Sequence, residues 1–127
     1  MTPTLLPLYG YPVAAGFPSP ADDFLEGYLD LNAYLVKHPA ATYFVRAKAD
    51  AMQGAGIFKG DLMVVDKSLT PAVGSVVIAV VAGEMFVRRL VKVEGQWALQ
   101  GEQGKPPKVL GDGLVVWGVV SNVIHKV

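Results

Sequence analysis

Two segments of this 127-residue chain combine residue types and positions that could support chemistry. In Lys48-Ala49-Asp50-Ala51-Met52, small residues lead into a glycine-rich loop, which leaves room for another backbone to approach. The second segment is Arg88-Arg89, and alternation along a strand would place these two side chains on opposite faces of a sheet. An inward guanidinium costs free energy unless it is paired. We therefore expect an edge strand whose two guanidinium groups both reach water.

The remaining polar residues favour structural roles over catalysis or ligand binding. A Ser/His/Asp triad needs a general base, and the two histidines, His38 and His125, are both expected to be solvated or structural. Asp22-Asp23 fit the negative charge preferred at a helix N-terminus, and Gly54 and Gly56 lack the lysine of a phosphate-binding loop. Because the chain has no cysteine and only two distant histidines, we predict no disulfide, no metal and no cofactor.

Composition and charge narrow the class of protein further. Hydrophobic residues make up 52% of the chain and charged residues 17%, so the chain can bury a core. Eleven basic residues balance eleven acidic ones and are scattered, which disfavours direct, specific DNA binding. The first basic residue is Lys37, and no apolar run is long enough to cross a bilayer. We expect a soluble, cytoplasmic protein that does not bind a membrane.

The chain divides into an arm and a domain. Residues 1–20 contain five prolines and no charge, which predicts an extended N-terminal arm that cannot fold alone. This arm is either a disordered terminus or a segment that docks on its own domain or on a partner. Residues 21–127 form the domain. Apolar residues from Phe24 to Leu35 recur at intervals of three and four, which predicts two short helical turns, the second capped by Asp30.

Everything after Thr42 indicates strand and turn. Valine, at twenty residues, is the commonest type, and Ala82-Gly83 and Glu94-Gly95 occupy positions where tight hairpin turns belong. The fold class is therefore mainly β, a compact antiparallel barrel or sandwich. The six predicted strands are Tyr43–Lys48, Leu62–Asp66, Ser75–Val81, Met85–Val93, Gln96–Gln100 and Leu114–Lys126.

Four segments, in this order and spacing, resemble the UmuD family of LexA-like, S24-type self-cleaving serine peptidases. They are Gly16-Phe17-Pro18-Ser19-Pro20-Ala21, Leu29-Asp30-Leu31-Asn32, His38-Pro39-Ala40-Ala41-Thr42-Tyr43-Phe44-Val45 and Gly60-Asp61-Leu62. The resemblance runs from about Gly16 to His125. It implies a β fold of the LexA C-terminal peptidase type, which dimerises and cuts its own N-terminal arm.

The resemblance also implies where the chemistry of the family would lie. The bond cut by the family corresponds to Ala15–Gly16. Its serine nucleophile, which precedes a methionine, corresponds to Ala51, and its general-base lysine corresponds to Arg88. In the family, a desolvated lysine loses its proton near neutral pH and then takes one from the serine hydroxyl, while backbone amides hold the oxyanion.

This chain departs from the family pattern at both chemical positions. Alanine has no oxygen that could attack a peptide bond, and arginine side chains stay protonated in proteins and cannot serve as a neutral base. We therefore predict that the chain, as written, does not cleave itself. Either it is an engineered form trapped before cleavage, or it is a natural relative that has lost catalysis and kept binding. The intact segments around Ala51, Arg88 and the Ala15–Gly16 bond favour engineering.

The resemblance implies a role in the bacterial DNA-damage (SOS) response. The expected partners are a second copy of the chain, the RecA filament on single-stranded DNA, which promotes cleavage, and a UmuC-type Y-family translesion DNA polymerase, polymerase V in the family's type case. The alternative is a non-catalytic decoy or regulator that pairs with active relatives or sequesters polymerase or RecA. The fifteen residues before Gly16 are too few for the DNA-binding domain of a LexA-type repressor, and a signal peptidase would need a membrane anchor.

Overall fold

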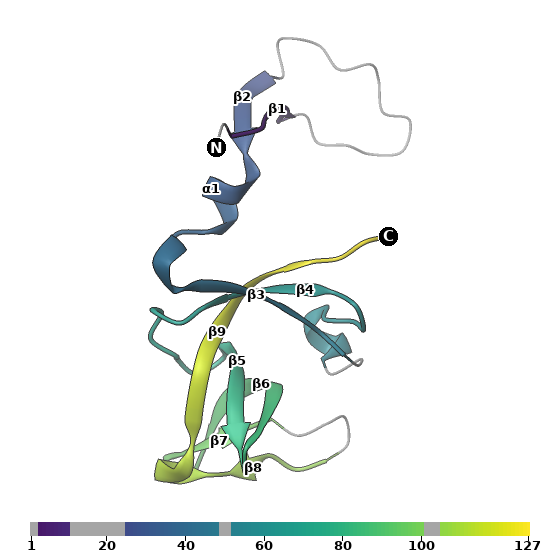
Figure 1. The fold of residues 1–127 in the computed structure, drawn as a ribbon. Coiled ribbons are helices and arrows are strands. Elements are labelled where there is room, and N and C mark those ends of the chain that lie inside the picture. The colour runs from purple at the N-terminus through teal and green to yellow at the C-terminus, as the bar shows by residue number, and fades with distance from the viewer. Residues whose placement is uncertain (1–2, 11–24, 49–51, 101–104) are drawn as a thin grey trace. The chain divides into compact units, whose positions relative to one another are not determined.

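The computed structural model describes residues 3–10, 25–48, 52–100 and 105–127 (Figure 1). These residues fall into two compact units, Met1–Lys37 and His38–Val127.

The first unit is a two-stranded ribbon followed by one short helix. Strand β1 (Leu5–Tyr9) pairs antiparallel with β2 (Leu25–Asp30), and α1 (Leu31–Leu35) follows directly. The helical turn predicted before Asp30 is wrong. That segment is a strand, and Gly27 has a φ of 146°, which no helix allows. The predicted cap is confirmed, because a carboxylate oxygen of Asp30 accepts a hydrogen bond from the backbone N–H of Ala33 at 3.3 Å.

The second unit is a seven-stranded antiparallel sheet in the order β3-β4-β9-β5-β6-β7-β8 (Figure 1). The strands are β3 (Thr42–Arg46), β4 (Leu62–Asp66), β5 (Val76–Val81), β6 (Glu84–Val93), β7 (Gln96–Leu99), β8 (Lys108–Val109) and β9 (Val115–Ile124). In the described part of the chain, the 3₁₀ turn η2 (Pro39–Ala41) leads into β3, η3 (Gln53–Ala55) lies between β3 and β4, and η4 (Gly111–Gly113) lies between β8 and β9. The mainly β, antiparallel prediction is confirmed, and the six predicted strands correspond to all of these strands except the two-residue β8.

The core lies on both faces of the central strand β5. On one face, Ile78 packs with a buried cluster that includes Met63 and Val65. On the other face, Val77 and Ala79 pack with a second cluster, which includes Leu90. Burial on both faces explains why β5 is a continuous apolar run and not an alternating one.

Two hairpin turns adopt the conformation that tight connections between strands require. Ala82 and Gly83 join β5 to β6 with φ values of 51° and 81°, and Glu94 and Gly95 join β6 to β7 with 50° and 79°. Two successive positive φ values match the right-handed twist of the flanking strands. Both predicted turns are therefore confirmed, although each has a non-glycine residue in the left-handed region.

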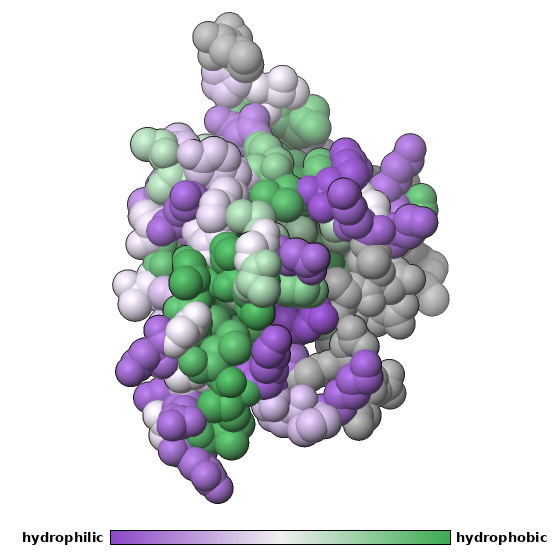
Figure 2. Space-filling view, turned by 60° about the horizontal axis from the view of Figure 1, so that its bottom comes forward, coloured by the Kyte–Doolittle hydropathy of each residue, from purple (hydrophilic) through white to green (hydrophobic). Residues whose placement is uncertain are grey.

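Some apolar surface remains exposed. Met85 on β6 and Val115 on β9 flank Val80 across three neighbouring strands, and each exposes more than half of its surface, at 54% and 55%. Figure 2 shows apolar residues gathered in a band between hydrophilic groups on one face of the molecule.

Candidate functional site

Of the four residues predicted at the site, the described part of the chain includes Arg88. Ala15 and Gly16, at the predicted bond, and Ala51, at the nucleophile position, lie outside the described residues. Of the predicted site, the structure therefore describes Arg88 and the segments on either side of residue 51.

Backbone hydrogen bonds fix the chain where it leaves β3 and where it returns toward β4. The Ala47 N–H donates to the Asp61 carbonyl at 2.9 Å, and the Gly60 N–H donates to the Ala47 carbonyl at 2.8 Å. On the far side, the Ile57 N–H donates to the Met52 carbonyl at 3.0 Å. Ala47 and Ile57 are both buried in the core cluster. The ends of the loop that carries residue 51 are thus held against the core.

Arg88 lies on β6 in the middle of the sheet, opposite Val77 of β5. The prediction of an edge strand is wrong, because β6 pairs with β5 on one side and with β7 on the other. Both arginines are half-buried, and each is held by a backbone carbonyl. Nη1 of Arg88 donates to the Val87 carbonyl at 2.8 Å, and Nη1 of Arg89 donates to the Gly74 carbonyl at 2.7 Å.

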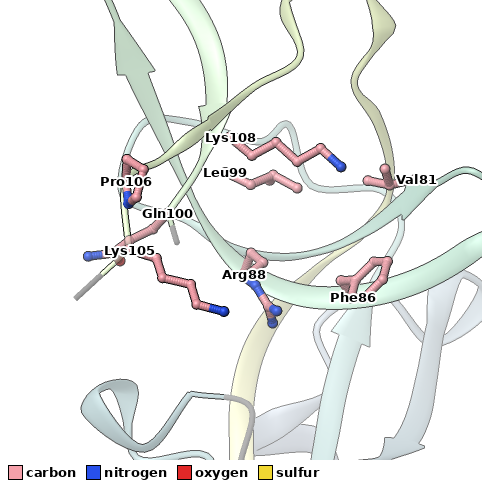
Figure 3. A pocket seen from close by; sticks show the side chains of 8 residues that line it. All are labelled: Val81, Phe86, Arg88, Leu99, Gln100, Lys105, Pro106 and Lys108. Atoms are coloured by element: carbon pink, nitrogen blue, oxygen red, sulfur yellow. The ribbon is translucent and has the colours of Figure 1, made fainter. Parts of the chain in front are cut away.

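Arg88 contributes to a pocket of about 260 Å³ on one face of the sheet (Figure 3). Its guanidinium carbon lies 5.5 Å from the centre of the Phe86 ring, close enough for a cation–π interaction. The pocket brings together side chains from β5, β6, β7 and β8 and from the segment before β8. Its lining residues are Val81, Phe86, Arg88, Leu99, Gln100, Lys105, Pro106 and Lys108.

A second polar cluster surrounds Asp66, at the end of β4. Its carboxylate accepts hydrogen bonds from the Ser68 hydroxyl at 2.6 Å and the Ser68 backbone N–H at 2.8 Å, and it lies 2.6 Å from Nδ1 of His38. The hydrogen bond from Ser68, followed by that from His38, lowers the pKa of Asp66 from 3.8 to about 2. An ionised carboxylate can only accept, so Nδ1 of His38 is the donor.

A third polar cluster, again a carboxylate paired with a histidine, lies at the start of β4. The buried carboxylate of Asp61 lies 2.6 Å from Nδ1 of His125 and accepts a hydrogen bond from the Phe58 N–H at 2.9 Å. The hydrogen bond from His125 is the larger cause, and that from the Phe58 N–H the next, of the lowered pKa of Asp61. The two histidines thus pair with the carboxylates that flank β4, in the structural role predicted for them.

Ser68, Asp66 and His38 supply the residue types of a catalytic triad but not its connectivity. In a triad the imidazole lies between the hydroxyl and the carboxylate. Here the carboxylate lies between the hydroxyl and the imidazole, and both groups hydrogen-bond to it instead of to each other. The cluster is suited to holding the chain together and not to nucleophilic attack. Sequence reasoning missed both acids, because 28 and 64 residues separate them from their histidines.

The described residues also bear on metal binding and on membrane insertion. Within ranges 3–10, 25–48, 52–100 and 105–127, no group of three or more His, Cys, Asp or Glu could hold a metal ion. No helix in those ranges is long and apolar enough to cross a membrane.

Comparison with known proteins identifies the family. The family described as "Peptidase S24-like" matches residues 7–120. Protein SamA of Salmonella typhimurium is 47% identical over 120 residues, which cover 94% of this chain and 85% of the relative. Protein ImpA of Escherichia coli is 42% identical over 94% of this chain and 83% of its own length. The LexA repressor of Shewanella baltica is 40% identical over 99% of this chain and 62% of its own length. The resemblance found in the sequence is confirmed, and the chain belongs to the S24-like peptidases, the family of the UmuD-type proteins.

Proposed function

We propose that this protein is a UmuD-type factor of the bacterial DNA-damage response, a type that is cut at Ala15–Gly16 under RecA stimulation to serve a translesion polymerase, and that this chain, as written, does not cleave itself. The family match across residues 7–120 carries this proposal, together with the alanine and arginine at the two positions where the family has its serine and lysine. Its proposed partners are a second copy of the chain, the RecA filament on single-stranded DNA, and a translesion polymerase of the UmuC type.

The surroundings of Arg88 support the loss of catalysis. A general base must offer a lone pair, and a guanidinium has only donors. Its Nη1 is engaged with the Val87 carbonyl, and its charge lies near the Phe86 ring. Replacing lysine by arginine at this position therefore removes the proton acceptor even if a serine is supplied at position 51.

The test is to restore both groups and follow the mass of the chain. The double variant Ala51→Ser/Arg88→Lys is expected to cut slowly at Ala15–Gly16 and to release the fragment Gly16–Val127. The rate should rise with pH, because the lysine must lose its proton before it can act as a base. Addition of RecA filaments on single-stranded DNA should accelerate the cut. The unaltered chain should stay intact under all these conditions.

Matched single variants assign the roles. Ala51→Ser alone is expected to stay whole, because the arginine remains a donor, and Arg88→Lys alone lacks a nucleophile. Equal cleavage by Ala51→Ser and by the double variant would overturn the role of position 88. If the double variant also stays whole, the alternative function gains support: a natural decoy or regulator that pairs with active relatives or sequesters polymerase or RecA. The arginine at position 88 is the observation that favours this alternative, because loss of the serine alone would already prevent cleavage.

A further inference from the structure

The pair of Asp61 and His125 lies beside the segment that follows position 51. Leu62, the first residue of β4, pairs with Ile124, the last residue of β9. Because the two strands are antiparallel, Asp61 and His125 come to the same end of this strand pair, where Oδ1 of the acid lies 2.6 Å from Nδ1 of the histidine. The carboxylate of Asp61 is buried and its pKa is lowered, so it is ionised at neutral pH and Nδ1 of His125 donates the hydrogen bond.

Asp61 connects His125 to the backbone on both sides of position 51. Oδ2 of Asp61 accepts a hydrogen bond from the Phe58 N–H at 2.9 Å, and the Asp61 N–H donates to the Phe58 carbonyl at 3.1 Å. The Asp61 carbonyl accepts from the Ala47 N–H at 2.9 Å, just after β3. The ring of His125 also lies against that of Phe58, with 5.5 Å between the ring centres. A side chain at the end of β9 is thus linked to the segment 52–61 through one carboxylate and one ring.

The pair of Asp66 and His38 has the same geometry at the other end of β4. Nδ1 of His38 lies 2.6 Å from the Asp66 carboxylate, and the histidine and acid side chains are 51% and 5% exposed, compared with 50% and 3% for His125 and Asp61. Asp66 also accepts two hydrogen bonds from Ser68, which follows β4. The two pairs should therefore contribute alike to general stability, and an effect on the segment 52–61 should belong to His125.

We propose that His125 is a positioning residue, which acts through Asp61 to hold the segment 52–61 in the place that the group at position 51 needs for self-cleavage. The inference rests on the proposed function, because it assigns a role in the reaction of the UmuD type. Without the histidine donor, the buried carboxylate has to turn toward water. The hydrogen bond that it accepts from Phe58 is then lost with it.

Amide hydrogen exchange of the full chain, as written, tests the positioning without any cleavage. His125→Phe keeps a ring beside Phe58 and removes the donor, whereas His125→Asn loses the ring and returns an N–H donor close to the place of Nδ1. The Phe58 amide should exchange at least about tenfold faster in His125→Phe and within about threefold of the parent rate in His125→Asn. The amides of β5, measured in the same samples, report unfolding of the whole sheet.

His38→Phe is the matched control. It should accelerate exchange of the Ser68 amide, which donates to Asp66 at 2.8 Å, and leave exchange of the Phe58 amide unchanged. His125→Phe should do the reverse. Equal acceleration of both amides by the two variants would show an effect on general stability alone and would overturn the proposal. A Phe58 amide that His125→Phe leaves unchanged would also overturn it.

The effect on the reaction is measured in the Ala51→Ser/Arg88→Lys chain. Adding His125→Phe should slow the cut at Ala15–Gly16 about tenfold, whereas adding His125→Asn or His38→Phe should leave the rate within about threefold. Equal rates in all these chains would overturn the positioning role and leave the proposed function standing. If the Ala51→Ser/Arg88→Lys chain does not cut at all, it is the proposed function that fails, and the exchange rates still decide whether His125 holds the segment.

Discussion

Gly118 on β9 offers the sharpest test of how the strands are packed, because the structure leaves no room for a larger residue there. A Cβ at this position would lie 2.5 Å from Cγ1 of Val65, about 1 Å closer than carbon atoms normally approach. Val65 is fully buried in the core cluster of β4, so it cannot retreat into solvent. The backbone of Gly118 is not in the left-handed region, so its substitution would introduce a steric clash without backbone strain.

The size of the effect follows from two opposing terms. Overpacking of a core costs about 1–3 kcal/mol, and alanine in a strand recovers about 0.5–1 kcal/mol relative to glycine. Taken near the middle of each range, the two effects predict that Gly118→Ala lowers the free energy of unfolding by roughly 1–2 kcal/mol. For a chain of this size, that corresponds to a fall in Tm of about 4–8 °C. Urea unfolding followed by circular dichroism and a thermal scan measure both quantities.

A matched control and a compensating change make the prediction specific. A Cβ on Gly113 would meet nothing within 4 Å, so Gly113→Ala should leave stability unchanged or raise it slightly. Adding Val65→Ala to Gly118→Ala removes the clashing methyl group, so the double variant should lose less stability than the sum of the two single losses. Additive losses, or a Gly118→Ala variant as stable as the parent, would refute the described approach of β9 to Val65.

Two further predictions concern the polar cluster around Asp66 and the hairpin between β5 and β6. The pKa of Asp66 is lowered from 3.8 to about 2 by its hydrogen bonds from Ser68 and His38, so its stabilising contribution is complete above about pH 4 and is lost as the pH falls toward 2. Asp66→Asn should therefore be less stable than the parent at pH 7, and the difference should shrink between pH 4 and pH 2 in urea titrations; a constant difference would contradict the assignment. Ala82 has a φ of 51°, so Ala82→Gly should raise the free energy of unfolding by about 0.5–1 kcal/mol in the same assay; a loss of stability would argue against the left-handed turn.

Strands with clear boundaries could be predicted from the sequence alone. Leu62–Asp66 is an apolar run that follows Gly60, and its predicted bounds coincide with those of β4. The segment that became β2 could not be assigned, because a spacing of four, as between Leu25 and Leu29, fits one face of a helix and one face of a strand equally well. Its pairing with β1 decides the outcome, and that pairing is a tertiary contact.

The polar clusters show a different limit of prediction from the sequence, because their members come from distant parts of the chain. The sequence predicts that His38 and His125 are solvated or structural, but it does not name their partners. Each partner carboxylate lies at one end of β4, and the histidines reach them because the sheet places β3 and β9 on either side of that strand. The Arg88 pocket depends likewise on β8, a two-residue strand too short to leave a pattern in the sequence.

The residue at position 88 decides whether a nucleophile restored at position 51 could act. A lysine at position 88 could exchange a proton with a nucleophile, whereas an arginine keeps a fixed charge and offers only donors. Fixed donors do not suit a proton that must move. It follows that supplying a serine at position 51 without replacing Arg88 should leave the chain whole, whereas the double variant Ala51→Ser/Arg88→Lys should cut.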